Sequence, residues 1–479
     1  MDVKGAKKVL VRAFAIYWAL VLLIYAVAYP QFRYAEVNSK SVTPSSVIDE
    51  ITDGEVVTQE FEIRMNRIRG VSLFAGTYDR VNTGSMRIVL SNREGTVLAE
   101  ETRDAASFKN NAYTYIGLKS PIICSEMESI VLSITTDGCT PGNALTVYSG
   151  VEWAEGTPVE NERYASLNGS YTIGRLCIDM VGDLERPFYI LYWVIVTGVF
   201  LLALLLCLYW WSKAKKGMNN PLVAVFTLMT RYGLLFRQLV SRDFKTKYKR
   251  SSLGLVWSFL NPLLMMAVQY VVFSTLFKSD IKNFPVYLLT GIVFFSFFSE
   301  AVTLGMTSIT SNASLIKKVY VPKYIYPFTR VISSLINFLL ALVPLFLVML
   351  VTASPFHLSL VLLLFDILCF VGFIIGISLL LTTAMTFFQD TQFLWNVISM
   401  IWMYLTPLFY PESIIPRQII GVYRLNPLYQ FITFARICII DGISPEPVMY
   451  LNCILSASLF LVLGVWVFRK YQDRFILYL

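Results

Sequence analysis

Long apolar runs with few charges alternate with polar stretches along the chain, and the lengths of these runs predict membrane-spanning helices. A helix crosses the hydrocarbon core of a bilayer with about 20 apolar residues. The runs that meet this length are Val9–Tyr29, Pro187–Trp211 and the ranges 253–277, 284–307, 325–351, 358–387, 392–410 and 449–468. The pattern predicts a membrane protein with about eight transmembrane helices, most of them in close succession after residue 250.

The stretch 30–186, between the first two predicted spans, has a different periodicity. Short runs such as Arg87–Leu90 and Ile130–Ile134 alternate between apolar and polar residues and are separated by turns rich in Asn, Gly and Asp. Alternation with a period of two is typical of half-buried strands. We therefore expect the fold class to be an all-α membrane protein with an inserted β-sandwich domain.

Composition and charge support a membrane protein and assign a side of the membrane to each part. Of the 479 residues, 56% are hydrophobic and only 15% are charged, which is too few charges for a soluble domain. Residues 30–186 carry 22 acidic and 14 basic residues, whereas 213–250 carry ten basic residues and one acidic residue. Basic loops favour the cytoplasm, so the net charge of +8 indicates topology rather than nucleic-acid binding. With eight spans both termini are cytoplasmic, and 30–186 and 410–448 lie outside the cell.

These boundaries divide the chain into five predicted parts. They are residues 1–29 (cytoplasmic N-terminus and first span), 30–186 (external β-sandwich), 187–212 (second span), 213–250 (cytoplasmic amphipathic helix) and 251–479 (six-span domain). The first span has no small-residue cleavage site after it and is expected to be an uncleaved anchor. The stretch 410–448 is too polar for an ordinary span and too apolar for a free loop. We expect a re-entrant helical hairpin there, covered by protein because its backbone is irregular.

The sequence offers little chemistry for catalysis. It lacks the G-x-x-x-x-G-K-[ST] loop that cradles nucleotide phosphates, and its one histidine, His357, argues against a catalytic triad or a zinc site. We therefore expect no catalytic residue, metal or cofactor in this chain. Cys124 and Cys139 lie in the expected external domain and are candidates for a disulfide.

Ionisable residues within the predicted spans are few, and this argues that the chain takes its energy from another subunit. They are Glu300 and Asp366, with Arg330 near a span end. An ion-coupled carrier normally needs a larger network, and helix packing is the alternative interpretation of these groups.

Two cytoplasmic segments have patterns suited to binding such a subunit. The segment 222–248 has an apolar side and a basic side and is expected to be an amphipathic helix on the inner membrane face; a lipid-surface anchor is the alternative. The loop 311–322 has an apolar centre between charges, and an exposed apolar patch suggests a protein contact. The candidate residues are Arg237, Arg242, Phe244, Lys245 and Tyr248 in the first segment, and Leu315, Ile316, Lys317, Lys318, Val319 and Tyr320 in the second.

Aromatic residues make up 15% of the chain and cluster within the predicted spans. Most are expected in belts at the membrane interfaces. A minority are candidates to line a conduit, because flat rings stack on sugar rings. The candidate channel aromatics are Trp257, Phe259, Tyr270, Trp395, Trp402 and Tyr404.

Six short motifs occur in a fixed order between Leu222 and the C-terminus. They are 239–250 leading into 253–264 (LGLVWSFLNPLL), 284–291 with 297–300 (FFSE), 314–322 (SLIKKVYVP), 389–390, 406–411 (TPLFYP), and 425–428 with Arg436 and Gly442. In this order they resemble the membrane subunits of type 2 ABC exporters that move O-antigens, teichoic acids and capsule-like polysaccharides. Within 30–186, the segments 71–90 and 109–113 are similar to jelly-roll modules found beside surface-polysaccharide enzymes.

The resemblance implies a homodimer that pairs with two copies of a separate ATPase, which binds the ATP and Mg. The amphipathic segment 222–248 and the loop 315–320 resemble the family's interface helix and coupling helix, which bind the ATPase. It also implies a lipid-linked polysaccharide as substrate and an external gate in 410–448. The candidate gate residues are Tyr410, Glu412, Arg417, Arg424, Asn426 and Arg436. Typical members begin just before the amphipathic segment, so residues 1–212 are an addition, with sugar binding or capping as its candidate roles.

Two other classes of function remain open on the sequence. One is a flippase or polymerase of lipid-linked sugars driven by an ion gradient or by its substrate, which would depend on Glu300 and Asp366. The other is a membrane receptor with a glycan-sensing external domain, which leaves the ordered motifs unexplained.

Overall fold

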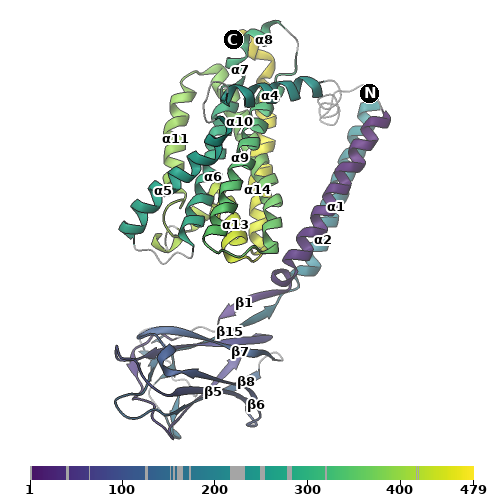
Figure 1. Ribbon diagram of the computed structural model, residues 1–479. Coiled ribbons are helices and arrows are strands. Elements are labelled where there is room, and N and C mark those ends of the chain that lie inside the picture. Colours follow the sequence, from purple (N-terminus) through teal and green to yellow (C-terminus); the bar gives the residue numbers. More distant parts are fainter. Residues whose placement is uncertain are drawn as a thin grey trace. The chain divides into compact units, whose positions relative to one another are not determined.

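The computed structural model describes most of the chain and divides into two compact units (Figure 1). The described residues are 3–38, 42–63, 65–124, 128–150, 153–154, 157–158, 165–171, 174–215, 232–248, 254–277, 283–318, 321–416, 418 and 420–479. One unit, Phe32–Tyr189, is built from strands, and the other, Met1–Gln31 with Ile190–Leu479, is mostly helical. The predicted fold class, a helical membrane protein with an inserted β domain, is confirmed.

The strand unit is a sandwich of two antiparallel sheets. The larger sheet has the order β1 (Tyr34–Asn38), β15 (Ile178–Glu185), β4 (Arg67–Gly76), β9 (Thr146–Gly150), β14 (Arg175–Leu176), with β2 (Ser46–Val47) on β9 and β7 (Ala112–Ile123) on β4. The smaller sheet has the order β13 (Ser170–Tyr171), β12 (Ser166–Leu167), β3 (Val56–Ile63), β8 (Glu128–Asp137), β5 (Ser85–Asn92), β6 (Val97–Asp104). The pair β10 (Trp153–Ala154) and β11 (Thr157–Pro158) stands apart from both.

Alternate side chains of both sheets point inward and form one core. In β3 the burial alternates strictly, and Gln59 is buried while Thr58 and Glu60 on either side of it are only partly buried. Val57 and Phe61 are the buried apolar residues of the same side. They pack with Ile130 and Leu132 of β8, and with Leu73 and other buried residues of the larger sheet. This is the arrangement that the period-two pattern predicts for a sandwich.

The candidate disulfide between Cys124 and Cys139 is absent, and both residues are buried thiols. Cys124 lies before the ten-residue strand β8, and Cys139 lies just after it. A strand rises about 3.3 Å per residue, so the two thiols are separated by the length of β8, roughly 30 Å. A disulfide requires Cα atoms less than about 7 Å apart, so this pairing is excluded.

In the helical unit, α1 (Val3–Arg33) and α2 (Phe188–Lys215) lie side by side. The Tyr17 hydroxyl donates to the Val196 carbonyl at 2.8 Å, and the Tyr192 hydroxyl donates to the Val21 carbonyl at 2.7 Å. Phe200 of α2 contacts the ring of Phe14. Long apolar helices paired through tyrosine hydroxyls in this way avoid leaving those hydroxyls unpaired among apolar groups.

The remaining long helices form the module that carries the site. They are α5 (Trp257–Phe277), α6 (Phe284–Met306), α9 (Ile325–Val351), α10 (Leu363–Phe387), α11 (Thr391–Leu405) and α14 (Pro447–Tyr471). Helix α6 packs against α5, α9 and α10 and is the most buried of the candidate spans. Helices α10 and α14 touch through glycines: a Cβ at Gly376 would lie 2.3 Å from the Phe460 carbonyl, and one at Gly464 would lie 2.3 Å from the Gly376 oxygen. Small residues of this kind permit close helix packing in a membrane.

One predicted span is shorter than expected. The described residues contain 7 helices long and apolar enough to cross a membrane, and α11, in the range 392–410, is not among them. Its 15 residues rise only about 22 Å, which is less than the hydrocarbon thickness of about 30 Å. The helix ends because Thr406 precedes Pro407 and adopts an extended backbone, as residues before proline do.

The stretch 410–448 folds as short helical pieces, as predicted. They are the 3-10 turn η4 (Glu412–Ile414), α12 (Ile420–Arg424), α13 (Pro427–Arg436) and the π-helical turn η5 (Ile437–Asp441). Helix α13 packs against α6, α10 and α14, and the ring of Phe431 contacts Phe370 and Phe373 of α10. The neighbouring helices therefore cover this irregular backbone, while its re-entrant position in the membrane stays a prediction.

Candidate functional site

Helix α4 (Gly233–Tyr248) lies along the start of α9 through its apolar side. Leu239 is buried against Val321 and Ile325, and Leu235 and Phe236 pack beside it. The candidate residues Arg237, Arg242 and Lys245 are exposed, Phe244 is half-buried, and the side chain of Tyr248 lies outside the described part. Apolar residues on one side and basic residues on the other make α4 amphipathic.

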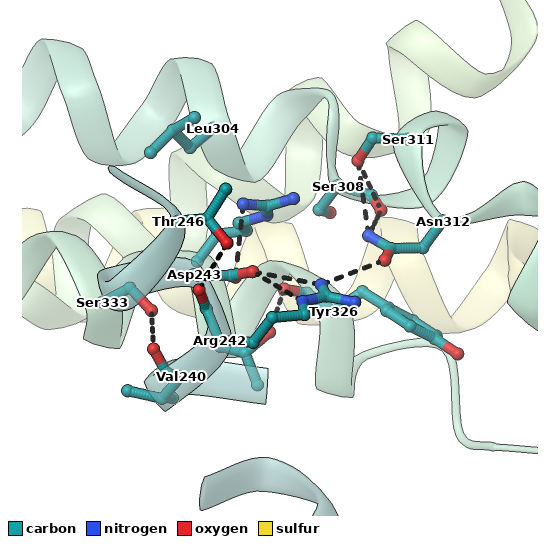
Figure 2. A network of polar contacts seen from close by, with 12 residues as sticks. Val240, Arg242, Asp243, Thr246, Leu304, Ser308, Ser311, Asn312, Tyr326 and Ser333 are labelled. Atoms are coloured by element: carbon teal, nitrogen blue, oxygen red, sulfur yellow. Dashed lines mark hydrogen bonds and ion pairs between the residues drawn. The ribbon is translucent and has the colours of Figure 1, made fainter. Parts of the chain in front are cut away.

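A buried carboxylate fastens α4 to two other segments (Figure 2). Asp243, whose side chain is 7% exposed, accepts from Arg242 at 3.0 Å and forms an ion pair with Arg330 of α9 at 3.2 Å. Arg242 also donates to the Asn312 side chain at 3.4 Å, and Asn312 precedes α8 (Ala313–Lys318). The carboxylate and its two arginines therefore connect α4 to α9 and to the turn before α8.

A second ion pair connects α4 to α6. The ammonium of Lys247 lies 2.8 Å from each carboxylate oxygen of Glu300. On the α9 side, Glu300 accepts from Asn337 at 2.9 Å and from Ser334 at 3.4 Å. The Lys247 and Glu300 side chains are 42% and 32% exposed, so solvent screens the pair and its strength is modest. The pair matters for its position, because the Glu300 carboxylate of α6 contacts both α4 and α9.

Two cavities meet at this ion pair. The larger has a volume of about 1110 Å³ and the smaller about 360 Å³. Lys247, Ser296, Glu300 and Asn337 line both of them. The larger cavity is also lined by Arg242, Asp243 and Arg330, together with Phe295 and Met403. Most of the charged and polar groups that line these cavities thus lie on α4, α6 and α9. Because Lys247 and Glu300 line both cavities, separating this ion pair would change the walls of both.

Arg436, at the end of α13, is buried and holds the α11–α12 connection against α6. One guanidinium nitrogen donates to the Pro407 carbonyl at 2.7 Å, and another donates to the carbonyls of Leu408 at 2.9 Å and Tyr287 at 3.2 Å. The guanidinium also lies 3.4 Å from the centre of the Tyr287 ring. A Cβ at Gly291 would lie 2.8 Å from this guanidinium, so the glycine provides its space.

Comparison with known proteins identifies the family. The sequence model of the family described as "ABC-2 type transporter" matches residues 234–440, which include all but the first residue of α4, and also Glu300 and Arg436. The O-antigen export system permease protein RfbA of Klebsiella pneumoniae is 30% identical over 251 residues, which are 51% of this chain and 95% of that relative. The chain belongs to the ABC-2 type transporter family.

Further relatives of this transporter have similar coverage. The O-antigen export system permease protein RfbA of Myxococcus xanthus is 29% identical over 245 residues, 50% of this chain and 94% of the relative. The polysialic acid transport protein KpsM of Escherichia coli is 24% identical over 246 residues, 48% of this chain and 92% of the relative. The resemblance inferred from the ordered motifs is therefore confirmed.

The structure places the predicted coupling loop of the transporter differently from the expected exposed apolar patch. Ile316 on α8 is 8% exposed and Leu315 is half-buried, and both pack with Phe475 of α15 (Phe475–Tyr478). Lys317 and Lys318 are exposed, and Lys317 donates to the Leu479 carbonyl at 2.7 Å. The surface that α8 presents is thus basic rather than apolar, because the C-terminal segment covers its apolar side. Val319 and Tyr320 lie outside the described residues.

The candidate channel aromatics do not form one set. Trp395 is 3% exposed, contacts Phe298 and donates to Thr303 at 3.1 Å, while Trp402 contacts Phe298 and donates to Asn426 at 2.7 Å. These two tryptophans pack inside the transporter subunit. Trp257, Tyr270 and Tyr404 are exposed and Phe259 is half-buried; of these, Trp257 lines the smaller cavity.

Three of the candidate gate residues hold the hairpin together. Asn426 caps α13 by accepting from the Leu428 amide at 3.1 Å, and Tyr410 donates to the Tyr404 carbonyl at 2.8 Å. Arg436 makes the buried contacts described above. Glu412 and Arg424 form an exposed ion pair at 3.7 Å. Arg417 lies outside the described residues.

Lys247, Asn337 and Asn312 complete the network around α4 and were not predicted as site residues from the sequence. Lys247 was hidden among many basic residues of 213–250. Asn337 offered a usable signal, because an amide in the middle of an apolar span normally has a polar partner there.

Proposed function

We propose that this transporter is the membrane-spanning permease of an ATP-driven exporter, which moves a lipid-linked polysaccharide outward across the bacterial plasma membrane. The observation that carries the proposal is the match to nearly the whole length of relatives named as O-antigen export permeases. A relative named as a polysialic acid transport protein extends this to a second class of surface polysaccharide. Polymer chemistry thus differs among relatives that share one permease module.

A separate ATPase, present in two copies that bind ATP and Mg, supplies the energy for export. The permease is a homodimer, and the polymer passes between its two copies. The sequence has no phosphate-binding loop of the G-x-x-x-x-G-K-[ST] type, which supports ATP binding by a separate chain. The exposed basic residues of α4 and α8, among them Lys245 and Lys318, supply a docking surface of one charge sign. Such a surface favours an acidic partner face and fast association.

Movement of the ATPase reaches the membrane helices through the charged groups of α4. Asp243 couples α4 to α9, and the Lys247–Glu300 pair couples α4 to α6. A displacement of α4 therefore acts on the two helices that line both cavities. In this arrangement the termini, α4 and α8 face the cytoplasm and residues 30–186 lie outside, in accord with the distribution of basic residues.

Reversing charge on the docking surface will separate the permease from its ATPase. We expect the double variant Lys245→Glu, Lys318→Glu to recover at least about tenfold less ATPase on co-purification, because two attractions become repulsions. The matched control is Arg93→Glu, Lys119→Glu, which makes the same change of charge at external side chains that are 78% and 87% exposed. Equal recovery of the ATPase by the two double variants would refute this docking surface.

A further inference from the structure

The outer face of the larger sheet carries a row of aromatic rings. Phe74 of β4 lies between Tyr113 of β7 and Tyr148 of β9, with ring centroids 5.0 Å apart on both sides and edge-to-face geometry. Tyr113 stands opposite Phe74 in the register of β4 and β7, and Tyr115 follows it on the same side of β7. Tyr113 is 38% exposed and Tyr115 is 52% exposed. We call these four residues the aromatic face.

Tyr115 lies flat on the sheet because two glycines make room beneath it. Gly70 and Gly117 are opposite each other in register. A Cβ at Gly70 would lie 2.6 Å from the Tyr115 hydroxyl and 2.7 Å from the ring atom Cε2, and a Cβ at Gly117 would lie 3.4 Å from Cε1. One side of the ring therefore covers backbone, and since half of the residue is exposed, the other side is open to solvent.

Hydrogen-bonding groups border the aromatic face at two places. Beside Tyr115, whose hydroxyl lies 3.5 Å from the Arg69 carbonyl, the Arg69 guanidinium is 48% exposed and pairs with Asp183, donating from Nε at 2.7 Å. The Asp183 carboxylate raises the pKa of Arg69, which therefore remains charged. At the other end, the Tyr148 hydroxyl donates to the Asn111 side chain at 2.7 Å, and Asn111 is exposed.

We propose that the aromatic face of the external domain binds a glycan, with a pyranose ring stacked on Tyr115 and with sugar hydroxyls bonded to Arg69 and Asn111. A sugar ring presents C–H groups on its flat side and hydroxyls at its rim, which matches a flat, open aromatic ring bordered by hydrogen-bonding groups. A lipid tail would need aliphatic side chains and no charged border. This inference rests on the proposed function for the identity of the glycan, which is the polysaccharide that the permease exports.

Binding of the full-length transporter, in detergent, to immobilised polysaccharide tests the proposal. The probe is the surface polysaccharide released from cells that make the transporter, with dextran as the reference polymer. We expect the wild type to bind the polysaccharide and Tyr113→Ala, Tyr115→Ala to bind at least about tenfold more weakly, since exposed aromatic anchors dominate such contacts. Tyr115→Phe keeps the flat ring and should bind within about threefold of the wild type.

The control is Thr102→Ala, an exposed position on β6 of the other sheet, which should leave binding unchanged. Equal melting temperatures of the variants and the wild type will show that the domain has kept its fold. The proposal is overturned if the wild type binds the polysaccharide no better than dextran, or if the double tyrosine variant binds as the wild type does. It is also overturned if that variant loses binding to lipid vesicles or to a second copy of the chain instead.

Transport measured in parallel distinguishes this inference from the function on which it rests. Export of the polysaccharide by wild-type transporter that shows no binding at the aromatic face would remove the inference alone. Absence of export together with absence of binding would remove the proposed function as well.

Discussion

Replacing Arg436 with methionine will destabilise the transporter by about 3 kcal/mol or more, because three backbone carbonyls lose their donors in a buried place. The lost donors serve Pro407, Leu408 and Tyr287, which belong to two different parts of the helical module. We expect the melting temperature of the detergent-solubilised protein to fall by roughly 6 °C or more, with less monodisperse protein on size exclusion. Arg436→Lys should recover only part of the loss, because an ammonium lacks the planar fork of donors.

Arg424→Met is the matched control for this change. Arg424 lies on α12 of the same hairpin, but its side chain is 67% exposed and its ion pair with Glu412 has a distance of 3.7 Å. Exposed pairs contribute little, so the control should melt within about 2 °C of the wild type. A melting temperature for Arg436→Met equal to that of Arg424→Met would show that Arg436 does not hold the hairpin in place.

Reversing either charge of the Lys247–Glu300 pair will reduce ATP-driven export by about tenfold or more, since like charges would then meet between α4 and α6. The single variants are Lys247→Glu and Glu300→Lys. The double variant exchanges the two residues and restores attraction, and we expect it to export within about threefold of the wild type. The measurement is export by cells or vesicles, normalised to the amount of transporter present in the membrane.

Glu300→Gln is the control for this pair, because its amide oxygen keeps an acceptor for Asn337 while the ion pair is lost. Lys247 can still donate to that amide oxygen, so α4 and α6 stay linked by a hydrogen bond, and screening makes the lost charge attraction small. This variant should therefore keep more than about a third of wild-type export. If the exchange variant exports no better than the single reversals, the pairing is not what carries motion from α4 to α6.

Elements with a strong local pattern could be predicted from the sequence. Apolar runs such as 325–351 locate a span by length alone, and alternation in 130–134 locates a strand, β8, whose burial follows the same period. The end of α11 was also readable in principle, since Pro407 stops the helix, but hydropathy continued to 410 and extended the predicted span. The hydropathy of an apolar run does not show where a proline ends the helix within it.

Contacts between distant segments could not be predicted. Lys247 and Glu300 are 53 positions apart, and no local pattern pairs them. The apolar residues Leu315 and Ile316 had the composition of an exposed patch, yet they pack against Phe475 at the far end of the chain. The Cys124–Cys139 candidate failed for a similar reason, because strand β8 separates two thiols that are close in sequence.

The structure explains why particular glycines and an arginine occur in the ordered motifs. Gly291 leaves room for Arg436, and a Cβ at Gly442, where φ is +71°, would lie 2.1 Å from the His357 ring. These positions belong to the ordered motifs on which the resemblance rests, and their constraints come from packing around α13 rather than from substrate chemistry.

ATP-dependent translocation in vesicles tests the central claim most directly. The purified transporter is reconstituted with and without its ATPase, and movement of a fluorescent lipid-linked polysaccharide is measured in the presence of ATP and Mg. The account predicts translocation only when the ATPase is present, and none when an ion gradient replaces ATP. Sustained translocation by the transporter alone would contradict it and would favour a flippase driven by an ion gradient or by its own substrate.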